Sequence, residues 1–131
     1  MSGITVKVYS KARDGGKALA ANFTVREFAC GDGSDAVFVA PELVAILQMI
    51  REHFGKPVII ESAFRSHAYN KKMDGSPQSR HLYGLAADIH IPGVAPRAVA
   101  ACAAALLPRR GGIGVYDTFC HVDVRPGKSR W

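Results

Sequence analysis

Alternating apolar and polar residues open the chain and predict its first strand. The apolar positions are Ile4, Val6 and Val8, and a period of two is typical of a strand with one buried face. Residues 11–17 are polar and contain two glycines, which predicts a loop or turn. Residues 24–27 have the pattern of a capping box, so we expect a short helix to begin there.

The clearest helical pattern runs from about Pro41 to Phe54. Proline suits the first position of a helix, and Gly55 suits the position just after its end. The apolar residues follow helical spacing and should face the core: Leu43, Ile46, Leu47, Ile50 and Phe54. A second, alanine-rich helix is expected from Pro96 to Leu107.

The remaining apolar runs are short and read as strands. Residues 57–61 predict a short buried strand, and residues 86–91 a second core strand. Residues 113–116 and 119–125 predict a hairpin near the end of the chain. Residues 65–80 are polar, with one helical turn near residues 68–73. Because strands and helices do not alternate regularly, we expect an α+β fold: a small, mostly antiparallel sheet with flanking helices, in a single domain spanning residues 1–131.

Composition and charge narrow the functional classes. The chain is 48% hydrophobic and 21% charged, as in globular proteins. Its longest uncharged apolar run, residues 98–108, is shorter than the roughly 20 residues of a transmembrane helix. No signal peptide is recognised at the start, so synthesis in the cytoplasm is expected. The net charge of +6 favours an anionic partner such as a cell-wall polymer. Basic residues do not cluster with aromatic ones, which argues against nucleic acid.

The three cysteines are far apart and form no C-x-x-C pair, which argues against a disulfide framework and a cysteine-based zinc site. Histidine and aspartate are better candidates for metal ligands. Asp88 falls in a predicted apolar strand, where a carboxylate is costly to bury unless it is paired or bound to a metal. In the last predicted strand, His121, Asp123 and Arg125 share one face. With His81, the residues Asp88 and His121 suit a zinc ion that keeps a fourth position open for water. The alternative is a set of hydrogen-bonded polar residues in the core.

A family resemblance rests on these same residues. The motif is Ser79-x-His81-x-x-Gly84-x-Ala86-x-Asp88, followed by His121-Val122-Asp123. It resembles the signature of the D-alanyl-D-alanine metallopeptidase family, which includes zinc D-Ala-D-Ala carboxypeptidases and phage L-alanyl-D-glutamate endopeptidases. Residues 61–66 are similar to the family's strand and arginine turn, and the resemblance covers about residues 22–125. The hedgehog signalling domain resembles this fold as well.

The resemblance implies a role for each residue of the motif. His81, Asp88 and His121 would be the ligands of one zinc ion per chain. Arg65 would contact the substrate carbonyl or carboxylate and help to stabilise the oxyanion. Ser79 would bind the substrate or support a ligand.

The catalytic carboxylate departs from the family pattern. In the family it often stands three residues before the last histidine ligand, and Thr118 occupies that position here. Asp123 and Asp117 are the candidates for the base. Asp123 is preferred because strand alternation points it to the same side as His121. Asp117 can instead be explained as a turn residue, which is the commoner role of aspartate in a hairpin.

The resemblance implies a zinc peptidase that hydrolyses an amide bond in the stem peptides of peptidoglycan, as a carboxypeptidase or an endopeptidase. Such a protein degrades cell wall in the manner of an endolysin. We expect it to act as a monomer, outside the cytoplasm after release by phage lysis or another route. The alternative is a non-catalytic, zinc-containing domain of the same fold that binds the cell wall or has a structural role.

Overall fold

A five-stranded sheet is the centre of the fold in the computed structural model, which describes residues 4–131. The strand order is β5-β6-β8-β7-β9. The bounds are β5 (Ile59–Ser62), β6 (Ala86–His90), β7 (Gly111–Val115), β8 (Cys120–Asp123) and β9 (Lys128–Arg130). Neighbouring strands are antiparallel except for the parallel pair β7 and β9. The expected α+β class with a mostly antiparallel sheet is confirmed.

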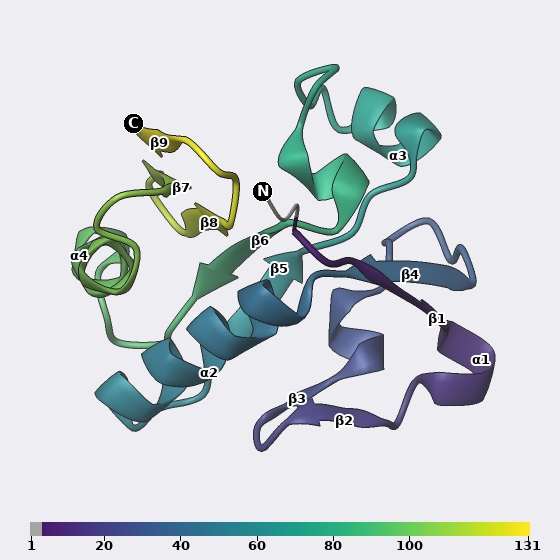
Figure 1. Cartoon of the computed structure of the whole chain (residues 1–131), viewed down its shortest axis with the longest axis horizontal. Helices are drawn as coiled ribbons and strands as arrows, with labels where there is room; N and C mark the ends of the chain where they lie inside the picture. Colours follow the sequence, from purple (N-terminus) through teal and green to yellow (C-terminus); the bar gives the residue numbers. More distant parts are fainter. Residues whose placement is uncertain (1–3) are drawn as a thin grey trace.

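Two long helices flank this sheet (Figure 1). Helix α2 (Pro41–Phe54) begins with a proline and ends at Gly55, whose φ of 62° is left-handed and suits glycine. These are the bounds that the sequence predicts. Helix α4 (Pro96–Leu106) packs against α2, β7 and β8. Its alanines let the helix approach the sheet closely, and Val99 and Ala103 are fully buried there.

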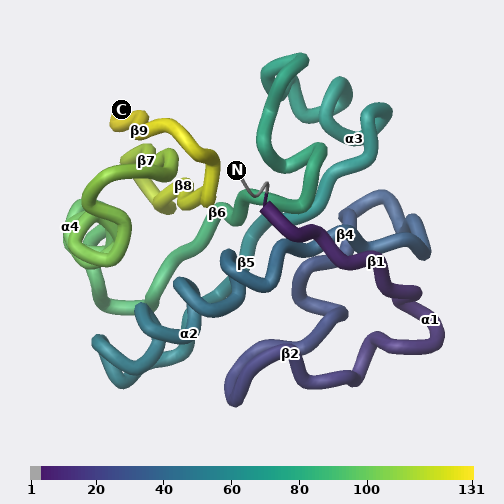
Figure 2. The backbone as a smooth tube through the Cα atoms, viewed as in Figure 1, coloured from purple at the N-terminus to yellow at the C-terminus, as the bar shows by residue number. Residues whose placement is uncertain are grey.

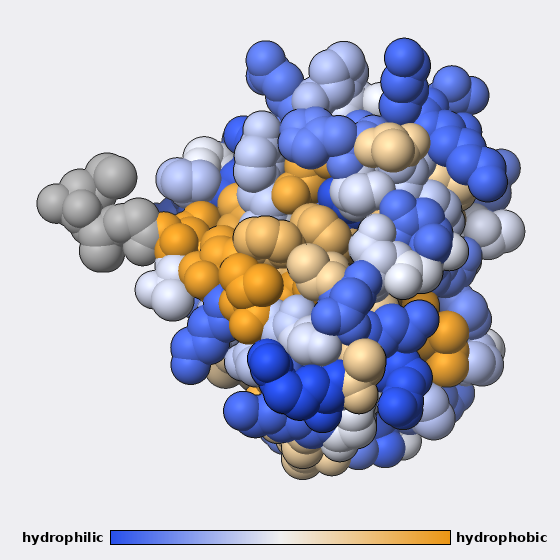
Figure 3. Space-filling view, turned by 90° about the vertical axis from the view of Figure 1, so that its right-hand side faces the viewer, coloured by the Kyte–Doolittle hydropathy of each residue, from blue (hydrophilic) through white to orange (hydrophobic). Residues whose placement is uncertain are grey.

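The N-terminal part forms two small sheets beside this body. Strand β1 (Lys7–Ser10) pairs with β4 (Ala36–Val39), and β2 (Ala18–Ala20) pairs with β3 (Phe23–Thr24). The capping box predicted at residues 24–27 is present at the short 3-10 helix η1 (Val25–Phe28). The face that carries α1 (Lys11–Asp14), β1 and β4 has an apolar area bordered by hydrophilic side chains (Figure 3).

Some boundaries differ from the sequence prediction. The first strand begins at Lys7 rather than Ile4. Residues 11–14, expected as loop, form the single helical turn α1 (Lys11–Asp14), because the Ser10 side chain accepts a hydrogen bond from the Arg13 amide. The strand expected at residues 57–61 is β5, two residues later. It lies at the edge of the sheet, so Ile59 is 41% exposed rather than buried.

The segment between β5 and β6 contains α3 (His67–Lys72) and the 3-10 helix η2 (Arg80–Tyr83). In the tube view, α3 and the β7–β9 strands lie on two sides of β6 (Figure 2). The expected alternation along β8 is present: Cys120, Val122 and Val124 are fully buried in the hydrophobic core. The opposite face of β8 carries His121 and Asp123.

All three cysteines are free thiols, as their spacing predicts. Within residues 4–131, no helix is both long and apolar enough to cross a membrane.

Candidate metal centre

Three buried side chains from separate elements meet at one point: His81 of η2, Asp88 of β6 and His121 of β8. Asp88 and His121 face each other directly because they are register partners in the antiparallel pair of β6 and β8. Each residue offers one potential ligand atom, and these atoms lie within 4.8 Å of one another. The fold thus brings together the three residues that the sequence nominates as metal ligands.

The orientation of His81 is fixed by a hydrogen bond on the far side of its ring. Its Nδ1 lies 2.7 Å from the carbonyl oxygen of Ala63, which requires Nδ1 to carry the proton and donate it. Nε2 faces Asp88 Oδ1 at 3.2 Å, so it is the His81 nitrogen turned toward the other two candidate ligands. The Ser79 hydroxyl accepts a hydrogen bond from the His81 amide at 3.2 Å, so it caps η2 at the ligand itself.

His121 lies between two carboxylates. Its Nδ1 is 3.0 Å from Asp88 Oδ1, and its Nε2 is 2.7 Å from Asp123 Oδ2. Asp123 has no exposed surface and is paired further with Arg125, whose Nη2 lies 2.7 Å away. A carboxylate that fixes the far nitrogen of a ligand histidine is typical of metal centres.

These contacts bear on the predicted role of Asp123 as the base, which stays a prediction. The carboxylate faces Nε2 of His121, the nitrogen turned away from Asp88, and every one of its contacts is with a protein donor. Asp123 points to the same side of β8 as His121, as strand alternation predicts, but its carboxylate is hydrogen-bonded to the His121 imidazole. The geometry favours the alternative in which Asp123 orients a ligand.

Burial and hydrogen bonding shift the pKa values of these groups in opposite directions. Burial by itself raises the pKa of Asp88, but hydrogen bonds with His121 and His81 outweigh it and hold the pKa below its usual range. Burial by itself lowers the pKa of His121, but its hydrogen bonds to Asp123 and Asp88 outweigh burial, so the pKa is raised overall. Both net shifts reflect the two carboxylates around His121, which favour positive charge at this point, and a cation held by the three residues would supply such charge.

Arg65 lies against the other oxygen of Asp88. Its Nη2 donates to Asp88 Oδ2 at 3.2 Å, and its Nε donates to the Ser62 hydroxyl at 3.0 Å. Its Nη1 donates to Asn70 Oδ1 at 3.3 Å. Three of its five N–H groups are engaged in this way, and the side chain still lines the adjoining cavity. Arg65 can therefore hold a ligand carboxylate and present charge to a bound molecule.

The cavity beside the three ligands has a volume of about 510 Å³. The three arginines that line it are Arg65, Arg80 and Arg125. Its aromatic side includes Tyr116 and Phe119, which stack at 4.5 Å between ring centroids, and Trp131, whose Nε1 donates to the Tyr116 hydroxyl at 2.8 Å. The sequence does not reveal Trp131 and Arg80 as residues of the site, because a single aromatic or basic residue outside a recognised motif gives no signal of its position.

Two exposed carboxylates belong to the cavity lining or lie next to it in the sequence. Asp117 lies in the connection between β7 and β8, next to Tyr116 of the cavity lining, but it does not line the cavity itself. Asp74, which the sequence did not nominate, lines the cavity from the loop after α3 and has a left-handed φ of 54°. These residues differ from Asp123 in that water reaches both of them.

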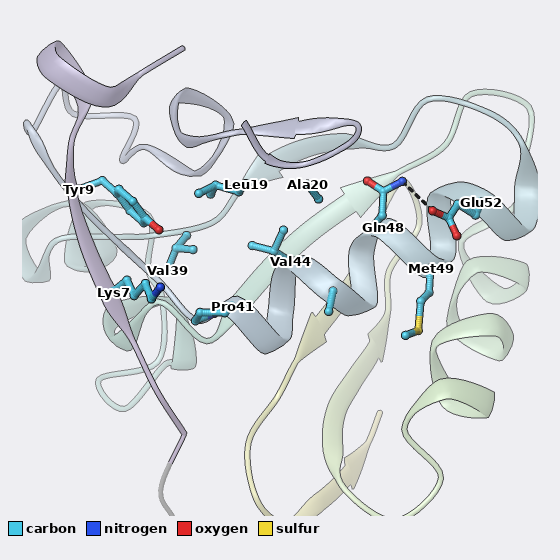
Figure 4. Close-up of a pocket in the computed structure, with 11 residues that line it drawn as sticks. Lys7, Tyr9, Leu19, Ala20, Val39, Pro41, Val44, Gln48, Met49 and Glu52 are labelled. Atoms are coloured by element: carbon cyan, nitrogen blue, oxygen red, sulfur yellow. Dashed lines mark hydrogen bonds between the residues drawn. The ribbon is translucent and has the colours of Figure 1, made fainter. Parts of the chain in front are cut away.

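A second cavity, of about 460 Å³, lies between β1, β2 and α2 (Figure 4). Apolar side chains such as Leu19 and Val44 form much of its lining, and the Gln48 side chain donates to Glu52 at 3.1 Å. Among the described residues that line it, Glu52 is the one carboxylate and there is neither histidine nor cysteine. This cavity therefore lacks the donors of a metal site.

The donor chemistry of the first cavity fits a zinc ion. Two imidazole nitrogens and one carboxylate oxygen, with the histidines fixed from behind, form the three-ligand set of zinc sites that leave a position open. A set of three ligands with an open position beside a cavity is typical of a catalytic metal centre. Residues 20–123 match the family model described as peptidase M15, so the chain belongs to the peptidase M15 family of metallopeptidases. No curated protein matches the chain.

Proposed function

We propose that this chain is a zinc-dependent peptidase that hydrolyses an amide bond in the stem peptides of peptidoglycan, as a D-Ala-D-Ala carboxypeptidase or an endopeptidase. The observation that carries the proposal is the convergence of His81, Asp88 and His121 at one end of a cavity that contains Arg65. Membership of the peptidase M15 family supports it. The proposed protein acts as a single domain and as a monomer.

Zinc held by the three ligands would polarise a substrate carbonyl and lower the pKa of a water molecule to about 7. The protein's own side chains would position the substrate and stabilise the charge that develops on it. Arg65 lines the cavity and has N–H groups beyond the three that are bonded to Ser62, Asn70 and Asp88, and these would stabilise the negative charge that develops on the carbonyl oxygen. Ser79, which lines the same cavity, would contribute a hydroxyl to substrate binding.

The arginines of the cavity offer contacts for an anionic substrate. Arg65 and Arg125 are paired with Asp88 and Asp123, while Arg80 makes no ion pair among the described residues. Stem peptides carry free carboxylates, which arginine binds in a bidentate manner. The net charge of +6 favours approach to the anionic wall. These features support a cell-wall substrate without favouring one of its peptide bonds over another.

The proton acceptor is to be sought among the exposed carboxylates, Asp74 and Asp117, because Asp123 is fully engaged behind His121. A general base has to come within hydrogen-bond reach of the proton that it takes, directly or through one water. Both side chains lie in connections rather than inside strands, Asp74 after α3 and Asp117 after β7. Replacement of each by asparagine identifies which of them is needed.

Because His121 and Arg125 hold the Asp123 carboxylate, this residue is less available as a base. That observation favours one second candidate function, a zinc-containing domain that binds the wall without cleaving it. Digestion of purified peptidoglycan, followed by mass spectrometry of the soluble fragments, separates the two functions. The peptidase predicts new fragments whose ends identify the bond cleaved, and these should be absent with the His81→Ala variant. Zinc in the protein without any new fragments would leave the binding domain.

A further inference from the structure

One wall of the cavity is a loop without helix or strand, residues 73–79, between α3 and η2. Most of its side chains are exposed, so packing contributes little to its position. Asn70 of α3 lies beneath it and is only 3% exposed. A buried amide of this kind normally has all its donors and acceptors engaged, and the partners of this one show what it holds in place.

The two ends of the Asn70 side chain bind in different directions. Its Nδ2 donates to the carbonyl oxygen of Ser76 in the loop at 2.8 Å. Its Oδ1 accepts from Arg65 Nη1 at 3.3 Å. The backbone adds a further link, since the Gly75 amide donates to the Asn70 carbonyl at 2.8 Å. Asn70 is thus bonded both to the cavity loop and to the arginine of the site.

Arg65 continues this chain of bonds to the ligands. Its Nη2 donates to Asp88 Oδ2 at 3.2 Å, and the other oxygen of Asp88 faces His81 and His121. The orientation of the Asp88 carboxylate hence depends on a guanidinium that Asn70 holds from the opposite side. Consecutive hydrogen bonds therefore connect Ser76 to Asn70, Asn70 to Arg65, and Arg65 to Asp88.

Gly75 keeps this chain of bonds intact by having no side chain. A Cβ at this position would overlap Asn70 Oδ1 and lie 3.1 Å from Arg65 Nη1. The loop therefore passes directly over the bond between Asn70 and Arg65. Substitution of Gly75 would displace the asparagine side chain without removing it.

We propose that Asn70 is a positioning residue with two separable roles: its Oδ1 orients Arg65 and so the metal ligand Asp88, and its Nδ2 fixes the loop that forms the substrate wall. The proposal rests on the metal centre of the proposed function. The first role controls metal affinity, and the second controls the order of the loop and the KM for a peptide.

Two substitutions divide these roles. Asn70→Asp keeps an oxygen toward Arg65 but sets a carboxylate oxygen against the Ser76 carbonyl, while Asn70→Leu is of similar size and loses both bonds. Zinc affinity is measured by competition with a chromophoric chelator, and loop order by hydrogen exchange at the Gly75 and Ser79 amides. The Gly75 amide is hydrogen-bonded to the Asn70 carbonyl and the Ser79 amide to the Ser76 carbonyl. KM and kcat are measured on peptidoglycan fragments.

The Asn70→Asp variant should bind zinc as the wild type does, exchange faster at both amides, and show a raised KM with kcat little changed. The Asn70→Leu variant should exchange faster as well, and its zinc affinity should fall about 10–100-fold, as is typical when a ligand loses its support. Gly75→Ala should reproduce the leucine variant, which provides the test if Asn70→Leu does not fold. Asn22, an exposed asparagine bonded to Gln48 away from the cavity, gives matched controls, Asn22→Asp and Asn22→Leu, with wild-type values throughout.

Equal loss of zinc affinity in the aspartate and leucine variants would overturn the separation of roles. Unchanged exchange at Gly75 and Ser79 in both would overturn the role in the loop. Zinc binding and exchange need no substrate, so these results stand even if the wild type cleaves nothing. That failure would instead reject the proposed peptidase function.

Discussion

The role of Asp123 is open to a direct test with Asp123→Asn. An amide is nearly the same size as a carboxylate, yet it replaces one acceptor oxygen by an NH₂ donor. Asp123 Oδ1 accepts from the Gly112 amide, the Arg125 amide and Arg125 Nε. Its Oδ2 accepts from His121 Nε2 and from Arg125 Nε and Nη2. Whichever way the amide turns, its NH₂ group therefore meets N–H donors.

The size of the effect follows from these contacts. A buried donor left without an acceptor costs about 1–3 kcal/mol, and part of this is recovered because the guanidinium of Arg125 is 21% exposed and can turn to water. We expect the free energy of unfolding of the metal-free protein to fall by about 1–3 kcal/mol. His121 also loses the acceptor that orients it, so zinc affinity should fall about 10–100-fold, which equals about 1.4–2.7 kcal/mol.

The assay combines urea unfolding, chelator competition for zinc, and turnover at saturating zinc. If Asp123 orients His121, stability and affinity fall, and saturating zinc restores much of the turnover. If Asp123 is instead the base, affinity stays unchanged while turnover falls about 10²–10⁴-fold at any zinc concentration. The second pattern would refute the orienting role. Asp117→Asn is the control for a nearby exposed carboxylate, and it should leave affinity and stability unchanged.

Three further predictions follow from the same geometry. Arg65→Ala should lower turnover at least ~10²-fold while the fold is kept, and near-normal turnover with normal thermal unfolding would contradict its role. In the presence of a chelator, the raised pKa of His121 stabilises the protein at pH values below 6.5, the unfolded value, and that stability is lost as pH rises through the folded pKa. Urea unfolding should therefore give a free energy that declines above pH 6.5 and recovers with zinc, whereas a flat profile from pH 6 to 9 would contradict the coupling. A Cβ on Gly114 would overlap the indole of Trp131, the one tryptophan of the chain, so Gly114→Ala should change its fluorescence spectrum. An unchanged spectrum would mean that the indole does not pack there in solution.

The sequence predicts best the parts of this fold that local chemistry determines. Helix α2 ends where its glycine adopts a left-handed conformation, and the capping box at residues 24–27 forms as its pattern predicts. Strand β5 is displaced from its prediction because position at a sheet edge depends on which strands pair with it. The short strands β2 and β9 were missed for a similar reason, since three residues carry too little periodicity to be recognised.

The ligands of the site could be nominated from the sequence because a charged residue inside an apolar strand needs a reason to be there. Asp88 and His121 are such residues, and the register of β6 with β8 brings them together. The base could not be assigned in this way. Strand alternation gives the side to which Asp123 points, but not that His121 and Arg125 meet it there. Asn70 likewise gains its partners only when the loop after α3 folds back over it.

Metal content tests the central claim most directly. The protein is purified without added chelator, and its zinc is measured by inductively coupled plasma mass spectrometry together with that of His81→Ala and His90→Ala. His90 is a matched control because it pairs with Glu61 at 2.7 Å and does not line the cavity. The structure predicts about one zinc per chain in the wild type and in His90→Ala, and a clear loss in His81→Ala. Equal zinc in His81→Ala and the wild type would contradict a metal centre at these residues.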